Sequence, residues 1–174
     1  MIHSIKNEQL IKQILTSAKT IAMVGVSSIK KDEPSNNIRR RPSIIVMKYL
    51  QEFGYRVIPI NPSSAGKIAY GETIVAKLKD VNIPVDIVNV FRPSKETPMI
   101  AEQVVKIGAK VIWLQYGIQN QEAQKIAKSA NITYIANKCI KQEYQRLFLK
   151  EALFFQLYEP NRIIDGQVQI INIE

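Results

Sequence analysis

Histidine and cysteine are almost missing from this sequence, which has one of each in 174 residues. A single cysteine, Cys139, excludes an intrachain disulfide and agrees with a reducing compartment. Because His3 is the only histidine and lies near the start of the sequence, a Cys–His or Ser–His catalytic pair is not expected. Histidine, cysteine and carboxylates do not cluster at metal-binding spacing either. The sequence therefore predicts no catalytic residue and no metal site.

Long hydrophobic runs and a signal sequence are also absent. No apolar stretch approaches the ~20 residues that span a bilayer, so no membrane partner is expected. The first residues, Met1–Glu8, do not contain the apolar core of a signal peptide. Both observations predict a cytoplasmic protein.

Acidic residues are outnumbered, with 15 Asp and Glu against 24 Lys and Arg, which gives a net charge of +9. Such a charge attracts polyanions and raises the question of nucleic-acid binding. The basic residues are spread along the chain, however, and only Arg39–Arg41 forms a tight run. We therefore favour a small anionic ligand and expect no nucleic-acid partner.

The hydrophobic pattern alternates between helices and strands along most of the chain. In two places a helical pattern is followed by a glycine, Gly54 or Gly108, and then by a β-branched strand. This alternation predicts a single-domain α/β fold of the Rossmann-like type, with a doubly wound, mainly parallel sheet and helices on both faces. The expected strands are 21–24, 55–60, 86–91, 110–114 and 132–136, and the expected helices are 8–17, 44–53, 74–78, 94–107, 120–130 and 142–158.

The two ends of the chain differ from the central domain. We divide the chain into an N-terminal helix packed on the domain (1–18), the Rossmann-like domain (19–147) and a C-terminal extension (148–174). The extension would contain a helix and a hairpin about Asp165-Gly166. Its many apolar residues are consistent with a homodimer contact.

Ligands of such sheets bind at the carboxyl ends of the strands. The first of these ends carries Gly25-Val26-Ser27-Ser28, a small-residue turn between a strand and a later helix. This unit holds phosphates in dinucleotide-binding folds, and the two hydroxyls can donate to phosphate oxygens. Ser27 stands where the second glycine of the NAD fingerprint would be, which argues against NAD. A plain turn would use the same residue types.

The second strand ends in Asn61-Pro62, with Lys67 soon after. NAD-binding folds place a carboxylate at this position, where it accepts hydrogen bonds from a ribose diol. A site with donors and no acid suits a ribose that carries a phosphate, as in coenzyme A or NADP. Lys67 is equally consistent with a solvated loop lysine.

Further candidates lie at a helix start and at the other strand ends. Arginine at the start of a helix opposes the helix dipole unless it faces an anion. Pro42 is well placed to begin a helix, so Arg41 and Ser43 are candidates beside it, with a solvated loop as the alternative. The candidates at the other strand ends are Phe91, Arg92, Gln115 and Gly117.

Cys139 is a candidate redox or thiol site. The neighbouring Lys138 and Lys141 would lower the pKa of a thiol and make it reactive. A buried and inert thiol is the alternative, and it is the more frequent state of a lone cysteine.

Several motifs together point to one family. They are Val24-Gly25-Val26-Ser27, Val46–Leu50 with Gly54-Tyr55, Ile58–Pro62, Asp86–Arg92, Trp113-Leu114-Gln115, and Cys139 with Glu143. Over about Lys19 to Leu147 the chain resembles the stand-alone CoA-binding domain proteins, which are Rossmann-like and akin to the CoA domain of succinyl-CoA synthetase. It departs from the family pattern at Asn89 and Asn137, where members often carry Asp.

The resemblance implies that coenzyme A or an acyl-CoA lies at the carboxyl edge of the sheet. It would place the pyrophosphate at Gly25, Val26, Ser27 and Ser28, the adenosine end at Asn61, Pro62 and Lys67, and the middle of the cleft at Val90, Phe91 and Arg92. We expect a non-catalytic or accessory CoA-binding module. The alternatives are an NADP- or CoA-dependent enzyme and a redox-regulated CoA carrier that uses Cys139.

Overall fold

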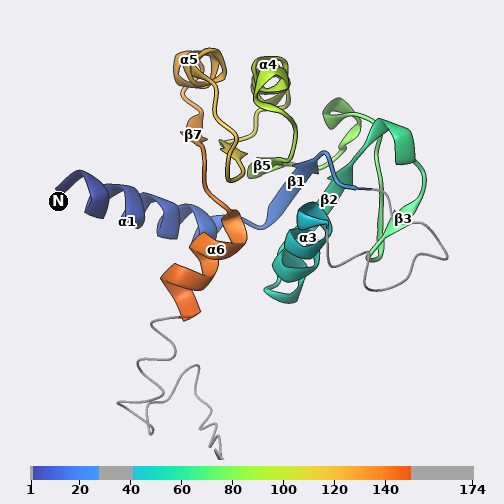
Figure 1. Cartoon of the computed structure of the whole chain (residues 1–174). Coiled ribbons are helices and arrows are strands. Elements are labelled where there is room, and N and C mark those ends of the chain that lie inside the picture. The colour runs from blue at the N-terminus through green and yellow to red at the C-terminus, as the bar shows by residue number, and fades with distance from the viewer. Residues whose placement is uncertain (1, 28–40, 150–174) are drawn as a thin grey trace, which may run out of the picture.

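A five-stranded sheet forms the centre of the molecule, and all its neighbouring strands are parallel (Figure 1). The computed structural model describes residues 2–27 and 41–149. The strand order is β2-β1-β5-β6-β7. The strands are β1 (Thr20–Val24), β2 (Arg56–Ile60), β5 (Ile87–Val90), β6 (Val111–Leu114) and β7 (Thr133–Ile135). The predicted α/β fold with a parallel sheet is confirmed.

The central strands are buried on both faces because helices cover both faces. All four residues of β5 and all four of β6 are buried, as parallel sheets between helix layers require. Figure 1 shows α4 and α5 on one side of the sheet and α1, α3 and α6 on the other. The helices are α1 (Ile2–Ser17), α3 (Pro42–Glu52), α4 (Thr97–Ile107), α5 (Gln121–Ser129) and α6 (Ile140–Tyr144), with a π-helical segment η4 (Gln145–Leu149) after α6.

Each face of the sheet has its own hydrophobic core. The core on the α1, α3 and α6 side includes Ile11, Met47 and Trp113. The core on the α4 and α5 side includes Val104 and Ala127. On the first side, the Tyr55 hydroxyl donates to the carbonyl of Leu15 at 2.5 Å, which fastens α1 to the start of β2. Burial raises the pKa of Tyr55, so the hydroxyl keeps its proton.

The order of the strands creates one switch point. The chain passes from β1 to β2 on one side and later returns to place β5 on the other side of β1. The connections on either side of this point run in opposite directions, and in open α/β sheets ligands bind at the carboxyl ends of the strands beside such a point, here β1 and β5. The turn at Gly25 follows β1 directly, and Phe91 follows β5.

Two glycines end helices as predicted. Gly54 follows α3 with φ +87°, and Gly108 follows α4 with φ +70°. Both values lie in the left-handed region that glycine adopts without a steric penalty. Each glycine therefore turns the chain directly into the next strand.

The prediction of a helix at 74–78 is wrong. Val75 instead bridges to Ile60 beside the sheet, and the short 3-10 turn η2 (Leu78–Asp80) follows. The sequence prediction also missed a small hairpin of β3 (Ile68–Ala69) and β4 (Glu72–Thr73). Apolar Ile74 and Leu78 are buried under this region and imitate helical spacing. The remaining 3-10 turns are η1 (Pro62–Ser64) and η3 (Ser94–Glu96).

The helix predicted at 142–158 begins at Ile140 and widens into η4, and its part beyond Leu149 lies outside the described residues. So does the hairpin predicted about Asp165-Gly166. None of the described helices combines the length and the apolar character that a membrane span needs.

Candidate functional site

The turn after β1 is packed against the end of β5 with no room for a side chain. Gly25 has φ +89°, and a Cβ added there would lie 2.8 Å from Arg92 Cδ and 2.9 Å from the Phe91 carbonyl oxygen. Gly25 N donates to Ile60 O at 3.0 Å, and Phe91 N donates to Val24 O at 2.8 Å. Two features therefore require glycine at this position: the positive φ, and the closeness of Arg92 and the Phe91 carbonyl to the place where a Cβ would lie. The turn joins the carboxyl ends of three strands.

Asn61 ties the end of β2 to the same turn. Its Nδ2 donates to Val26 O at 2.8 Å, and its Oδ1 accepts from Ser63 N at 2.9 Å. The side chain therefore bridges two strand ends and caps the short turn η1. Because both of its groups are used within the protein, Asn61 shapes the site more than it offers hydrogen bonds to a ligand.

The N-terminus of α3 reaches the turn through a pair of serines. Ser27 N donates to Ser43 Oγ at 3.0 Å. The Ser43 hydroxyl in turn donates to Ser27 Oγ at 3.2 Å. Ser43 is buried, whereas Ser27 is partly exposed. This arrangement directs the positive end of the helix dipole toward the turn. The Arg41 carbonyl accepts from Ile44 N and Ile45 N and so begins α3.

Arg92 lies over the turn but is held by an acid of its own segment. Its Nε and Nη2 donate to the Glu96 carboxylate at 2.8 and 2.9 Å. These hydrogen bonds lower the pKa of Glu96, and they outweigh the opposing effect of burial. The guanidinium is about half exposed, with 47% of the side-chain surface accessible. An incoming phosphate would compete with Glu96 for this group.

A buried amide pair lies below the turn, between β5 and β6. Gln115 Nε2 donates to Asn89 Oδ1 at 2.7 Å, and both residues are buried. Within residues 2–27 and 41–149, Asn89 Nδ2 has no hydrogen-bond partner. A buried donor without a partner costs about 1–3 kcal/mol, so such groups usually mark a water or ligand position.

The other described residues that the sequence predicted for the site are either buried in the core or exposed in loops. Val90 is buried in the core on the α4 and α5 side, and Pro62 is exposed at the start of η1. Lys67 is exposed in the turn before β3. Gly117 N donates to Asn137 Oδ1 at 2.8 Å, which ties it to the end of β7. Ser28 lies outside the described residues.

Cys139 is the N-cap residue of α6 and packs, half-buried, against the core on the α1 side. The ammonium of Lys138 lies 3.6 Å from the Glu143 carboxylate. An ion-paired lysine gives less support to a neighbouring thiolate than a solvated one.

Asn89 is the residue that the site prediction missed. A polar side chain within the apolar strand Ile87-Val88-Asn89-Val90 is the signal that could have found it, because an amide in a doubly buried strand needs a partner. The sequence did single out Gln115, which the structure identifies as that partner.

The CoA binding domain, a family of protein domains, matches residues 19–145 of this chain. The chain belongs to this family. The uncharacterized protein YneT of Bacillus subtilis is 41% identical over 131 residues, which are 75% of this chain and 89% of that protein.

The chain is also similar to solved structures in fold and in sequence. The structure of cell-free ID.343 from Thermus thermophilus has a TM-score of 0.72 and 39% identity, and the match covers 81% of this chain and 98% of that one. A hypothetical protein from Pyrococcus horikoshii OT3 has a TM-score of 0.69 and 38% identity, covering 80% of this chain and 91% of that one.

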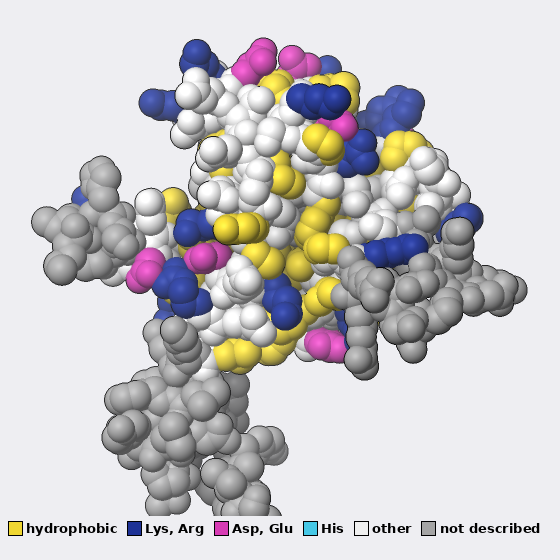
Figure 2. Space-filling view, in the orientation of Figure 1, with side chains coloured by type: hydrophobic (Ala, Val, Ile, Leu, Met, Phe, Trp, Pro, Cys, Tyr) yellow, Lys and Arg dark blue, Asp and Glu magenta, His cyan; other side chains and the backbone are white. Residues whose placement is uncertain are grey.

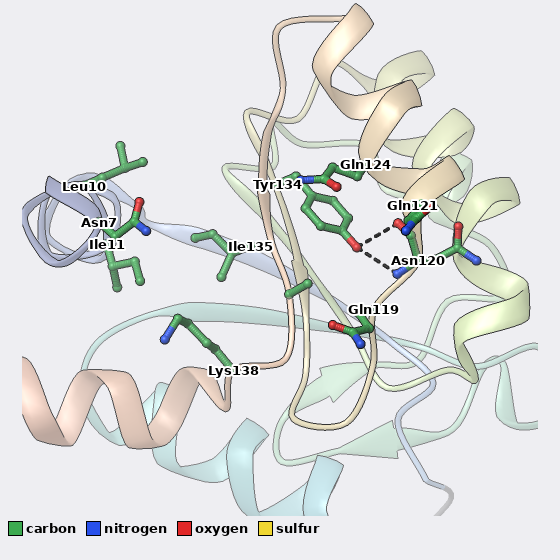
Figure 3. A pocket seen from close by; sticks show the side chains of 11 residues that line it. Asn7, Leu10, Ile11, Gln119, Asn120, Gln121, Gln124, Tyr134, Ile135 and Lys138 are labelled. Atoms are coloured by element: carbon green, nitrogen blue, oxygen red, sulfur yellow. Dashed lines mark hydrogen bonds between the residues drawn. The ribbon is translucent and has the colours of Figure 1, made fainter. Parts of the chain in front are cut away.

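A large cavity lies at a different place, beside β7. It has a volume of about 660 Å³ and lies between α1 and α5 (Figure 3). The Gly25 turn remains the candidate site, because it lies at the switch point of the strand order, where ligands of such sheets bind. The cavity is lined by Asn7, Leu10, Ile11, Gln119, Asn120, Gln121, Gln124, Tyr134, Ile135, Ala136 and Lys138.

Proposed function

We propose that the protein binds coenzyme A or an acyl-CoA across the carboxyl ends of β1, β2 and β5, as a non-catalytic or accessory module. The observation that carries the proposal is the junction at Gly25, where a Cβ would lie 2.9 Å from the Phe91 carbonyl. Glycine holds the ends of β1 and β5 together in the kind of tight turn that begins the phosphate-binding unit of dinucleotide-binding folds, and membership of the CoA binding domain family supports the choice of ligand.

The charges around the junction favour an anion. The positive end of α3 is joined to the turn through Ser43 and Ser27. In this arrangement the pyrophosphate lies on the turn and the helix N-terminus, where backbone dipoles favour negative charge. Arg92 then exchanges its contact with Glu96 for a contact with phosphate.

The end of β2 favours CoA over NAD. Asn61 occupies the position at which a ribose diol would need a carboxylate, and its amide is used by Val26 and Ser63. A phosphorylated ribose does not need that acceptor. We assign the adenosine end to this side of the turn, with Pro62 and Lys67 at the margin.

Thermal unfolding with added nucleotides tests the proposal. When CoA exceeds its Kd about 100-fold, we expect the Tm to rise by about 5 °C or more. CoA without its 3′-phosphate should give a smaller shift, and NAD should give none. No shift with millimolar CoA, or a larger shift with NADP than with CoA, would refute the proposal.

Two alternatives are less well supported. A CoA- or NADP-dependent enzyme needs an acid or base at the junction, and the one carboxylate that contacts the described part of it, Glu96, is ion-paired with Arg92. A redox-regulated carrier needs a reactive Cys139, whereas Lys138 is paired with Glu143. A protein-bound CoA that dithiothreitol releases would favour the carrier.

The scattered positive charge does not favour nucleic acid. Lys and Arg side chains on the face in Figure 2 lie among neutral and hydrophobic ones and do not form a continuous stripe. We therefore keep a small nucleotide-containing ligand as the partner, in a cytoplasmic protein. A gel shift with DNA or RNA that persists at physiological salt would contradict this choice.

We further propose a homodimer through the C-terminal extension. Aromatic rings gather next to the start of this extension. The ring centroids of Phe53 and Phe148 each lie 4.7 Å from that of Tyr144, and Phe53 is 39% exposed. Partly exposed rings of this kind favour a protein contact. Light scattering should give twice the monomer mass for the intact protein and the monomer mass for Leu157→Glu.

A further inference from the structure

The sheet has an open edge at β7. Thr133 N donates to Lys110 O at 3.0 Å, and Ile112 is the register partner of Tyr134. In a parallel ladder the residues that bond a given neighbour alternate, so the backbone N–H and C=O of Tyr134 point away from β6. Within the described part of the chain, no strand lies on that side of β7.

The opposite edge of the sheet is covered. Val75 N donates to Pro59 O at 3.0 Å, and Asn61 N donates to Val75 O at 3.0 Å. The chain thus supplies its own extended segment to the outer side of β2. An uncovered edge with unpaired backbone groups favours pairing with another strand, so β7 is a candidate for a similar cover.

The groove beside β7 has two unlike walls. On the α1 side, Leu10, Ile11 and Ile135 form a mainly apolar wall that also carries Asn7 and Lys138, and Leu10 is 42% exposed. On the α5 side, the wall consists of Gln121, Gln124 and the Tyr134 ring, whose hydroxyl bonds with Asn120 (Figure 3). A strand added here would therefore need apolar side chains on one face and polar side chains on the other.

One segment of this chain has that alternation. Gln167-Val168-Gln169-Ile170 presents two apolar residues on one face of a strand and two glutamines on the other. It lies outside the described residues. We propose that residues 167–170 add as a strand to the edge of β7 in the same chain, with Val168 and Ile170 against α1 and the glutamines toward α5.

The connection is long enough for this placement. Lys138 lines the groove, and α6 with η4 carries the chain from Ile140 to Leu149, roughly 15 Å at the helical rise. Residues 150–166 could span about 60 Å at most. Arg146 pairs with Glu8, so the end of η4 stays close to α1, which forms one wall of the groove. The connection is therefore long enough for residues 167–170 to reach the groove.

Amide hydrogen exchange of the intact protein tests this placement. The Tyr134 amide should exchange at least about tenfold more slowly than in Val168→Glu/Ile170→Glu, which would put carboxylates against Leu10 and Ile11. The matched control is Ile163→Glu/Ile164→Glu, which adds the same charges to the same extension and should keep the protection. The Ile112 amide, inside the sheet, reports in each variant that the fold is unchanged.

Three outcomes would overturn the proposal. The first is rapid exchange at Tyr134 in the unmodified protein. The second is protection that survives Val168→Glu/Ile170→Glu. The third is protection that increases with protein concentration, since it would assign the groove to a second copy. None of these measurements uses CoA, so they stand apart from the test of nucleotide binding.

Discussion

The two ends of β5 are built in opposite ways. At its amino end, Asp86 accepts hydrogen bonds from Lys19 N at 2.9 Å, Thr20 N at 3.1 Å and Lys110 Nζ at 3.0 Å. At its carboxyl end, Gly25 packs closely against the Phe91 carbonyl, and Asn89 Nδ2 has no hydrogen-bond partner among the described residues. The same strand is therefore closed at one end and left with unused hydrogen-bonding capacity at the other.

This difference predicts that the amino end of β5 serves the stability of the fold and that its carboxyl end serves ligand binding. Burial of Asp86 works to raise its pKa, but the hydrogen bonds from Lys19, Lys110 and Thr20 lower it overall, so the charged form is stabilised in the folded protein. The Asn89 donor weakens the fold locally, and a functional site is where such costs are usually retained. We expect substitutions at the two ends to have different consequences.

The largest effect should come from Gly25→Ala. The new Cβ would lie under 3.0 Å from Phe91 O, and a left-handed φ adds its own penalty, so we expect a loss of about 3 kcal/mol in unfolding free energy. CoA affinity should fall more than about tenfold. Gly54→Ala is the matched control, because its φ is +87° and nothing lies within 4 Å of its added Cβ.

The control should lose only about 1 kcal/mol and keep its CoA affinity. Equal losses of stability in the two variants, measured by urea unfolding, would show that Gly25 is not crowded. Equal losses of affinity would show that the junction is not the ligand site.

Gln115→Leu should cost about 2 kcal/mol, because it leaves both groups of the buried Asn89 amide without a partner. The double variant Asn89→Leu/Gln115→Leu should be less destabilised than the sum of the two single variants. A double-mutant cycle by urea unfolding measures this difference. Strict additivity would mean that the two amides do not act as a pair.

Asp86→Asn should cost about 1 kcal/mol at pH 7 and leave CoA binding unchanged. The folded-state pKa of Asp86 lies below that of the unfolded chain, which is about 3.9. Its contribution is therefore complete above pH 5 and is lost as the pH falls through the folded-state pKa. Urea unfolding from pH 7 to pH 2 should show the two proteins converging in acid. A constant difference would contradict this account.

Glu96→Gln should have the smallest effect. The substitution removes the charge that holds Arg92 and frees the guanidinium for phosphate. We expect CoA affinity to rise about two- to threefold at low salt, and the gain to shrink as salt is added. Calorimetric titration at two salt concentrations measures both changes. A weaker affinity for CoA would mean that Glu96 orients Arg92 for the ligand.

The sequence predicted the fold better than the site. Buried β-branched strands and helix-ending glycines such as Gly54 are local signals, so the strands and most helices were predicted within a few residues. The segment around Val75 was mistaken for a helix because its role depends on Pro59 and Asn61, which pair with it across space. No local pattern carries that information.

The site shows the same limit. Gly25, Ser27 and Arg92 stood out by residue type and position. That Ser43 supports Ser27, and that Asn61 is used within the protein, follows from contacts that the sequence alone does not give. Lys67 and Gly117 were chosen by proximity to strand ends, yet the chain carries them toward the β3 hairpin and the end of β7.

The Gly25 junction also has a consequence for the order of folding. It joins residues of β1 to Ile60 and Phe91, which lie about 35 and 66 positions further along the chain. During synthesis, β1 and the turn emerge first, but the junction exists only after β5 has paired with β1. A ligand of this junction would therefore bind only the assembled sheet, and it would stabilise the folded chain by an amount that grows with the ligand concentration relative to its Kd.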